Sequence, residues 1–186
     1  MNKIKELILV TGNKGKADNA ARLIGFPVTN YKTDLLEIQT LELQEVVEAK
    51  LKAAFEIVQK PVIVEDVALE FCEYKRLPGT FIKFFEKELG LEKLCQMLDG
   101  KNRAALAKCI IGFTDGANTK YFKGEQSGQI ATAPRGENGF GWDRIFISDE
   151  FPNKTNAELT ESEYNKYFMK MRRFDLLKDY CQRDKI

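Results

Sequence analysis

Three short stretches of the chain carry residue types that could bind an anion, bind a ligand at a strand end or stack on a flat base. The first is ILVTGNKGKADNAARLIG at residues 8–25, where a β-branched run ends in Thr11, Gly12 and Asn13. A helix start follows, with Lys14, Gly15 and Lys16. Backbone N–H groups at a helix start bind anions, and the lysines would add positive charge. The Walker A and GxGxxG patterns are both missing, so an ordinary turn with surface lysines is an equally good interpretation.

The second stretch is the acidic pair Glu65-Asp66, which follows the apolar run Val62–Val64. We expect this run to be a buried strand that ends at the pair, and open α/β sheets bind ligands at strand ends. Side chains alternate along a strand, so one carboxylate should enter a cleft while the other faces surface cations. Glu37, in a loop, could supply another carboxylate. Solvated acids at a strand end and in a loop are the alternative interpretation.

The third stretch is PRGENGFGWD at residues 134–143. Glycines beside an aromatic ring allow close backbone approach, and Phe140 or Trp142 could stack on a flat base. Asp143 could accept hydrogen bonds from a base edge. A tight loop around a core tryptophan is the alternative.

Composition narrows this chemistry. The 186 residues, 44% hydrophobic and 31% charged, suit one folded domain. The absence of histidine excludes imidazole bases, Ser-His and Cys-His nucleophiles and histidine-bound zinc. A metal would need carboxylate and backbone oxygens, which suits Mg²⁺ or Mn²⁺. The net charge of +1 argues against a nucleic-acid binder.

Cysteine usage and hydropathy indicate the compartment. The four cysteines lie far apart without a CxxC pair, which favours reduced, buried thiols. We find no signal peptide or long apolar run. The sequence therefore predicts a cytoplasmic protein with no membrane partner.

Alternating strands and helices would position these residues in the first half of the chain. We expect strands at Ile4–Val10, Pro27–Tyr31 and Val62–Val64. Helices between them should end near Gly25 and cover Leu43–Val58, which carries an apolar stripe. The alternation points to an α/β sheet.

The second half mixes both patterns. We expect helices at 80–89 and 91–98, strands at 103–113 and 118–132 around an Asp-Gly turn, and a strand at Trp142–Ile147. One final helix should start at Thr160, where Glu163 completes a capping box. Its apolar stripe is Tyr164, Tyr167, Phe168, Met171, Phe174, Leu177 and Cys181. The charge run Lys170–Arg173 is typical of a solvated helix face.

These stretches together resemble the inosine triphosphate pyrophosphatase family, also called HAM1-like, over nearly the whole chain. The family's TGNxxKxxE is matched by Thr11, Gly12, Asn13 and Lys16. Its acidic pair, LPG and IK are matched by Glu65-Asp66, Leu77–Gly79 and Ile82-Lys83. Its PRG…GFGWD…F signature is matched by Pro134–Gly136, Gly139–Asp143 and Phe146.

The resemblance implies a fold and an activity. The fold would be α/β, an elongated mixed sheet flanked by helices in two lobes with a central cleft, as a single two-lobed domain over residues 1–186. The activity would be hydrolysis of a nucleoside triphosphate such as ITP, dITP or XTP to the monophosphate and pyrophosphate. It implies Mg²⁺, with Mn²⁺ as a substitute, usually a homodimer, and no nucleic-acid partner.

The resemblance also implies roles for single residues. Phosphate contacts carry over to Thr11, Gly12, Asn13, Lys16 and Lys50. Lys14 and Gly15, which lie between them, are also expected to bind the substrate. Metal-binding and base-activating carboxylates carry over to Glu37 and Asp66, which makes Asp66 and Lys16 the expected catalytic residues. Base recognition carries over to Phe140, Gly141, Trp142 and Asp143.

The chain departs from the family's pattern near the base. The family's Lys-Asn and Ser-His-Arg fall on Tyr164, Asn165, Phe168, Met169 and Lys170, so Tyr164, Met169 and Lys170 are the expected contacts. A one-turn slip would instead bring Arg172 or Arg173 near the site. Asn19 replaces a glutamate, and Val67 replaces the Ser or Thr that usually follows the catalytic Asp.

These departures leave two hypotheses. One is an active pyrophosphohydrolase with altered base preference. The other is a catalytically impaired nucleotide-binding or regulatory protein of the same fold.

Overall fold

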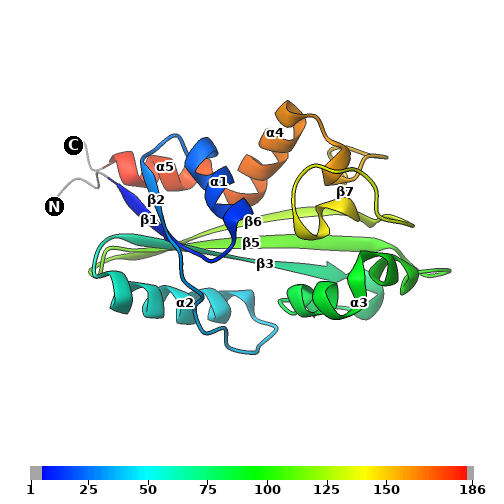
Figure 1. The fold of residues 1–186 in the computed structure, drawn as a ribbon, viewed down its shortest axis with the longest axis horizontal. Helices are drawn as coiled ribbons and strands as arrows, with labels where there is room; N and C mark the ends of the chain where they lie inside the picture. Colours follow the sequence, from blue (N-terminus) through cyan, green and yellow to red (C-terminus); the bar gives the residue numbers. More distant parts are fainter. Residues whose placement is uncertain (1–5, 184–186) are drawn as a thin grey trace. The chain divides into compact units, whose positions relative to one another are not determined.

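The computed structural model describes residues 6–183 (Figure 1). Its strands are β1 (Leu7–Val10), β2 (Val28–Tyr31), β3 (Val62–Phe71), β4 (Pro78–Gly79), β5 (Ala104–Thr114), β6 (Thr119–Ile130) and β7 (Phe146–Ser148). Its α-helices are α1 (Lys14–Leu23), α2 (Leu43–Val58), α3 (Ile82–Gln96), α4 (Glu161–Arg172) and α5 (Phe174–Arg183). Three short 3₁₀ turns are η1 (Cys72–Tyr74), η2 (Gly141–Arg144) and η3 (Asn156–Glu158).

The strands form one seven-stranded mixed sheet. Its order is β2-β1-β3-β5-β6-β7, with β4 paired to β3. β1 runs parallel to β2 and β3, which requires the crossovers that α1 and α2 provide. β4 and β7 run antiparallel to their partners. The predicted α/β class with a mixed sheet and flanking helices is confirmed.

The chain divides into two compact units. Unit 1 comprises the segments up to Asp66, 109–124 and from Phe168 onward, and unit 2 comprises 67–108 and 125–167. The chain passes between the units within β3, β5, β6 and α4. A single two-lobed domain over residues 1–186 stays a prediction.

Unit 1 has helices on both faces of its strands. Figure 1 shows α2 on one face and α1 with α5 on the other. The predicted stripe of α2 is buried at Leu43, Val46, Val47, Leu51 and Ala54. Each large apolar side chain buried in this way contributes about 1.5–3 kcal/mol to stability, so this stripe fixes α2 on the sheet.

The final helical region differs from its prediction. The predicted apolar stripe is buried at all seven positions. However, Arg173 adopts a left-handed backbone conformation with φ of +50°. The prediction of one continuous helix is therefore wrong, and the region forms α4 and α5.

β3 is longer than its sequence pattern suggested. The predicted strand end at Glu65-Asp66 is wrong, because β3 continues to Phe71. Apolar residues beyond the acidic pair, such as Ala68, Leu69 and Phe71, extend the buried strand. The two carboxylates therefore lie in the middle of a strand. The first predicted strand is confirmed from Leu7, and its residues 4 and 5 lie outside the described part.

In unit 2, Figure 1 shows α3 on one face of the strands. η2 contacts α3, and β7 pairs with β6 as a strand of the sheet. α3 is kinked at Gly90, where φ is +77°, as the two predicted helical patterns require. The predicted strand at Trp142–Ile147 is wrong over its first half, which forms η2. The cause is local, since the carboxylate of Asp143 accepts a hydrogen bond from the Phe140 N–H and closes a turn.

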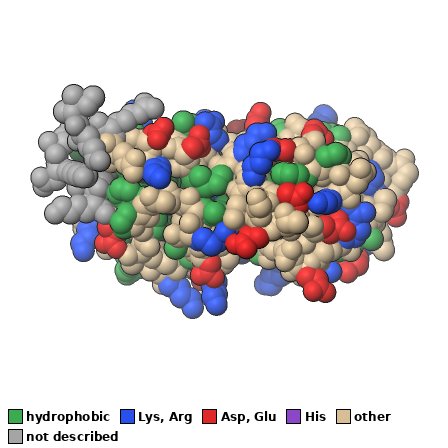
Figure 2. Space-filling view, turned by 90° about the horizontal axis from the view of Figure 1, so that it is seen from above, with side chains coloured by type: hydrophobic (Ala, Val, Ile, Leu, Met, Phe, Trp, Pro, Cys, Tyr) green, Lys and Arg blue, Asp and Glu red, His purple; other side chains and the backbone are tan. Residues whose placement is uncertain are grey.

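The surface carries charges of both signs. Figure 2 shows acidic and basic side chains interspersed over the face drawn there. Among the helices of residues 6–183, none has the length and apolar character that a membrane crossing requires.

Candidate active site

The turn before α1 is stabilised by its own side chains. Asn13 caps the helix, and its side-chain Oδ1 accepts a 3.0 Å hydrogen bond from the Lys16 N–H. Thr11 Oγ1 accepts one of 3.1 Å from the Asn13 N–H. A Cβ at Gly12 would lie 2.3 Å from Asp34 Oδ1, so a larger residue there would have to displace the exposed Asp34 side chain. The turn is thus preformed, and two of its N–H groups are already satisfied.

Three buried charged side chains, including Lys16, form a cluster around the carboxylate of Glu65. Lys16 Nζ lies 3.5 Å from Glu65 Oε1 and donates a 3.2 Å hydrogen bond to the Glu65 carbonyl. Arg172 Nε lies 3.3 Å from Glu65 Oε2. Lys16, Glu65 and Arg172 are 8%, 4% and 5% exposed. We call these residues the cationic triad, because two cations share one carboxylate.

A second group has the opposite composition. Lys50 Nζ lies 2.9 Å from Glu37 Oε1 and 2.9 Å from Asp66 Oδ2. Burial would lower the pKa of Lys50, but the Asp66 and Glu37 carboxylates outweigh it and hold the pKa above its usual value. We call Glu37, Lys50 and Asp66 the acidic triad, because two carboxylates share one cation.

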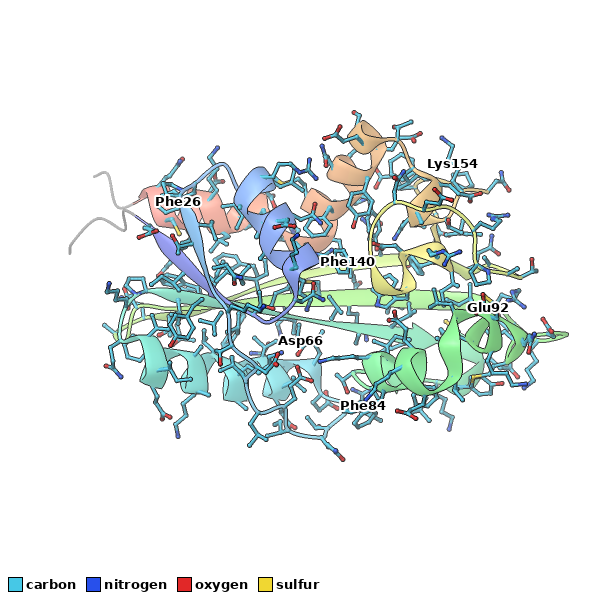
Figure 3. The ribbon with its side chains drawn as sticks, in the orientation of Figure 1. Phe26, Asp66, Phe84, Glu92, Phe140 and Lys154 are labelled. Carbon is cyan, nitrogen blue, oxygen red and sulfur yellow. The ribbon has the colours of Figure 1, made fainter. Side chains whose placement is uncertain are left out.

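Neighbouring residues of β3 supply the two triads. Glu65 meets partners on α1 and α4, and Asp66 meets its partner on α2. α1 and α2 lie on opposite faces of the strands, and Figure 3 labels Asp66 on the side of α2. The predicted alternation of the two carboxylates is therefore confirmed. The expectation that one of them faces surface cations is wrong, because the partners of Glu65 are the buried Lys16 and Arg172.

The acidic triad fits a hard divalent cation. Two carboxylates from different segments, Glu37 and Asp66, converge on one ammonium group, so the place already favours positive charge. Mg²⁺ prefers carboxylate oxygens and keeps several waters. Within residues 6–183, no three Asp, Glu, Cys or His side chains converge as a metal site. A bound metal would take its other ligands from water or a phosphate.

In unit 2, Asp143 organises the Gly139–Asp143 loop. Its Oδ2 accepts hydrogen bonds from the Phe140 N–H at 3.0 Å and the Tyr164 hydroxyl at 2.9 Å. Its Oδ1 accepts one of 3.3 Å from the Asn156 amide. Asp143 and the buried Tyr164 are therefore hydrogen-bonded to each other, whereas Phe140 is half-exposed. The geometry therefore favours Phe140 as the ring that could meet a base.

The ring of Trp142 is buried. It packs edge-on against Phe146, with 5.6 Å between ring centroids. Next to it, a Cβ at Gly141 would lie 3.3 Å from Glu86 Oε2. Burial, and then the charge of Asp143, raises the pKa of Glu86. Glu86 thus brings a carboxyl group to the backbone of the loop.

The other predicted site residues fall in several places. Lys14 and Lys170 are exposed, and Gly15, Met169 and Val67 are half-exposed. The Asn19 amide donates a 3.0 Å hydrogen bond to the Gly15 carbonyl, and its oxygen accepts one of 2.9 Å from Arg22. Asn19 therefore bonds to its own helix. The substrate-binding roles of all these residues stay predictions.

Sequence reasoning missed three residues that shape these regions, Asp34, Glu86 and Asn156. No motif marks them, because each meets its partner through the fold. Arg172 was named as part of a solvated charge run and as a slipped alternative to Lys170. The first interpretation is wrong for Arg172, which is 5% exposed. Its pairing with Glu65 depends on where α4 ends, which the sequence pattern placed incorrectly.

Comparison with known proteins decides the family. The model of the Ham1 family matches residues 7–180. The chain belongs to the Ham1 family.

Several curated proteins are similar to this Ham1-family chain over its whole length. The inosine triphosphate pyrophosphatase of Kluyveromyces lactis is 39% identical, and the match covers 94% of this chain and 95% of that protein. The protein of the same name from Schizosaccharomyces pombe is 36% identical with full coverage of both.

Solved structures agree. The Staphylococcus aureus Ham1 protein is 28% identical and has a TM-score of 0.80, with 97% of this chain and 100% of that chain covered. A HAM1 protein from Coxiella burnetii, 22% identical, also has a TM-score of 0.80 and is similar in fold.

Proposed function

We propose that this Ham1-family protein is a nucleoside triphosphate pyrophosphohydrolase, which cleaves the α–β phosphoanhydride and releases a monophosphate and pyrophosphate. The observation that carries the proposal is the pair of triads on consecutive residues of β3. Relatives at 36–39% identity over the whole chain are named inosine triphosphate pyrophosphatases, which supports ITP, dITP or XTP as substrate.

The acidic triad would hold the metal, Mg²⁺ or in its place Mn²⁺. Glu37 and Asp66 are the proposed ligands, because their carboxylates already share one cation. When bound, the metal would neutralise phosphate charge and acidify water. Lys50 lies between the carboxylates and keeps its charge, since its pKa is raised, and it would turn to a phosphate oxygen.

The reaction needs one proton acceptor. Water attacks the α-phosphorus, an O–P bond forms, and the bond to the α,β-bridging oxygen breaks, so pyrophosphate leaves with the bonding electrons. Asp66 is the proposed acceptor of the water proton, a task that needs no histidine. Lys16 and the turn Thr11–Gly15 are proposed to bind the phosphates, where positive charge stabilises the transition state.

Base recognition is proposed for the loop of unit 2. Phe140 is the proposed stacking ring, since it is half-exposed beside Gly141. Trp142, Asp143 and Tyr164 would support it from the buried side through the contacts described above. Val67, Met169 and Lys170 remain proposed substrate contacts.

We further propose a homodimer that acts on a nucleotide in the cytoplasm, without nucleic acid or membrane partners. Exposed apolar side chains in unit 2 support the dimer: Leu77, Phe84 and Leu89 are 43%, 50% and 44% exposed. Phe84 projects from α3 in Figure 3. Light scattering of Phe84→Glu, compared with wild type, tests this assembly.

The experiment that tests the activity is a pyrophosphate-release screen. The panel contains ITP, XTP, dITP and the four standard triphosphates, each with Mg²⁺ and with Mn²⁺. We expect pyrophosphate and monophosphate in equal amounts from at least one triphosphate. No turnover of any member contradicts the proposal.

A catalytically impaired nucleotide-binding protein is the second candidate. The observation that favours it is Asn19, which replaces a family glutamate and forms hydrogen bonds to Gly15 and Arg22 of its own helix. Calorimetry that finds tight nucleotide binding without turnover would support this candidate.

A further inference from the structure

The cationic triad contains a buried arginine to which the proposed reaction gives no task. Arg172 is the last residue of α4. It lies 3.3 Å from Glu65, and its guanidinium carbon lies 3.5 Å from the centroid of the Phe168 ring. Stacking on an aromatic ring and pairing with a carboxylate fix a guanidinium in place. Arg172 is therefore a rigid part of the triad.

The backbone around Arg172 is shaped for this position. On β6, a Cβ at Gly124 would lie 2.0 Å from the Met171 carbonyl oxygen, so only glycine lets the end of α4 approach so closely. Arg173 then turns the chain away with its positive φ. A cation at a helix C-terminus is also favoured by the helix dipole. Local structure thus delivers the Arg172 charge to Glu65.

Arg172 changes the net charge around the Glu65 carboxylate. Glu65 has one negative charge, and both Lys16 and Arg172 approach its carboxylate. Burial, followed by the charge of Glu65, raises the pKa of the nearby Cys109 thiol, which is therefore neutral. The triad has a net charge of +1, whereas Lys16 and Glu65 alone would sum to zero.

We propose that Arg172 is a positioning residue that offsets the Glu65 charge, so that the Lys16 ammonium stays available to a polyphosphate. Glu65 holds Lys16 in place, and Arg172 prevents Glu65 from neutralising it. The inference rests on the proposed function for the identity of the anion, a triphosphate chain. It predicts that anion affinity follows the net charge of the triad and not the number of ion pairs that remain.

The test compares four proteins with wild type. They are Arg172→Met, Arg172→Lys, Glu65→Gln and the double variant Glu65→Gln/Arg172→Met. The probe is inorganic tripolyphosphate, titrated by calorimetry in metal-free buffer at fixed ionic strength. Inosine serves as the uncharged ligand in parallel titrations.

The expected order of tripolyphosphate affinity follows the charge of the triad. Arg172→Met, with no net charge, binds at least fivefold more weakly than wild type, and Arg172→Lys less than threefold more weakly. Glu65→Gln binds as tightly as wild type or tighter, and the double variant binds within twofold of wild type. Inosine binding stays within twofold throughout.

A purely structural role predicts another order. If affinity followed lost ion pairs, Glu65→Gln and the double variant would bind as weakly as Arg172→Met. That result, or tripolyphosphate affinity of Arg172→Met within twofold of wild type, overturns the proposal. If Arg172→Met does not fold, a fivefold loss in Glu65→Gln or in the double variant overturns it.

A matched control removes a comparable ion pair elsewhere. Lys108 lies 2.8 Å from Glu70 in unit 2, and Lys108→Met should leave tripolyphosphate affinity unchanged. The two proposals also fail separately. If the tripolyphosphate affinities of the variants follow the predicted order but wild type turns over no triphosphate, only the proposed function is refuted. Turnover with equal tripolyphosphate affinity in all variants refutes only the role of Arg172.

Discussion

The cationic and acidic triads use the same kinds of side chain in opposite proportion. Around Glu65, two cations share one carboxylate, and around Lys50, two carboxylates share one cation. Their net charges are therefore +1 and −1. Glu65 and Asp66 are consecutive residues, so a single step along β3 changes the ion that the protein attracts.

The difference teaches that the neighbours of a residue set its role more than its type does. The carboxylate between two cations supports them, whereas the carboxylate that shares one cation with another acid is the proposed metal ligand. A metal-dependent phosphotransfer site needs both signs close together, because the substrate is an anion and its cofactor is a cation.

The largest effect expected is on turnover in Asp66→Asn. Loss of the proposed base and metal ligand should reduce pyrophosphate release by about 100- to 10,000-fold. A steady-state pyrophosphate assay at saturating Mg²⁺ measures it. Glu70→Gln changes a buried acid of unit 2; it is the control and should stay within about threefold of wild type. Equal turnover of Asp66→Asn and wild type would remove Asp66 from the mechanism.

Lys50→Met tests the acidic triad through stability. Without the shared ammonium, Glu37 and Asp66 repel one another, and we expect a loss of about 2–4 kcal/mol in the free energy of unfolding. Mg²⁺ should restore part of it, because a ligand that binds only the folded state stabilises it. Thermal unfolding with and without Mg²⁺ measures both effects. An equal Mg²⁺ response in Lys50→Met and Lys108→Met would contradict the metal assignment.

Glu86→Gln tests an acid that lies near another acid, Asp143, and so differs from the acids of the triads, which pair with cations. The folded-state pKa of Glu86 is raised by burial and by Asp143. Ionisation of Glu86 therefore lowers the stability of the folded protein. This loss is absent below the unfolded pKa near 4.5 and grows as the pH rises through the folded pKa. Glu86→Gln should be more stable than wild type at pH 7, by less than about 1 kcal/mol because Glu86 is half-exposed, and not at pH 4. Chemical denaturation at pH 4 to 7 measures the difference in free energy of unfolding between Glu86→Gln and wild type. A difference that stays constant over this range would contradict the prediction.

Asn19→Ala should have the smallest effect. Asn19 bonds within α1 to Gly15 and Arg22, whereas Glu65 holds Lys16. We expect turnover within about twofold of wild type and a gain of at most about 0.7 kcal/mol from helix propensity. A tenfold fall in pyrophosphate release would show that Asn19 supports the site in a way that its contacts do not reveal.

The sequence predicted the elements that carry regular patterns. Leu43–Val58 forms a helix with the predicted bounds, because its apolar stripe has helical period. The capping box at Thr160 forms, with the Thr160 N–H 2.8 Å from Glu163 Oε2. Motif order also identified the family and the segments that form both triads.

The remainder depended on contacts that periodicity does not encode. β3 continues past two acids, which form ion pairs with cations from α1, α2 and α4, and no local sequence signal marks those partners. The role of Arg172 required the break at Arg173, a backbone conformation that arginine rarely adopts. Tyr164 was expected at a base, and the fold gives its hydroxyl to Asp143.

The central claim is that consecutive carboxylates of β3 serve ions of opposite sign, and a crossed titration tests it most directly. Glu65→Gln and Asp66→Asn are each titrated with Mg²⁺ alone and with metal-free tripolyphosphate, by calorimetry. We predict that Asp66→Asn loses at least tenfold in Mg²⁺ affinity and retains tripolyphosphate affinity, whereas Glu65→Gln retains Mg²⁺ affinity and binds tripolyphosphate at least as tightly as wild type. If both variants lose affinity for the same ion to the same extent, the two carboxylates belong to one undivided site, which contradicts the central claim.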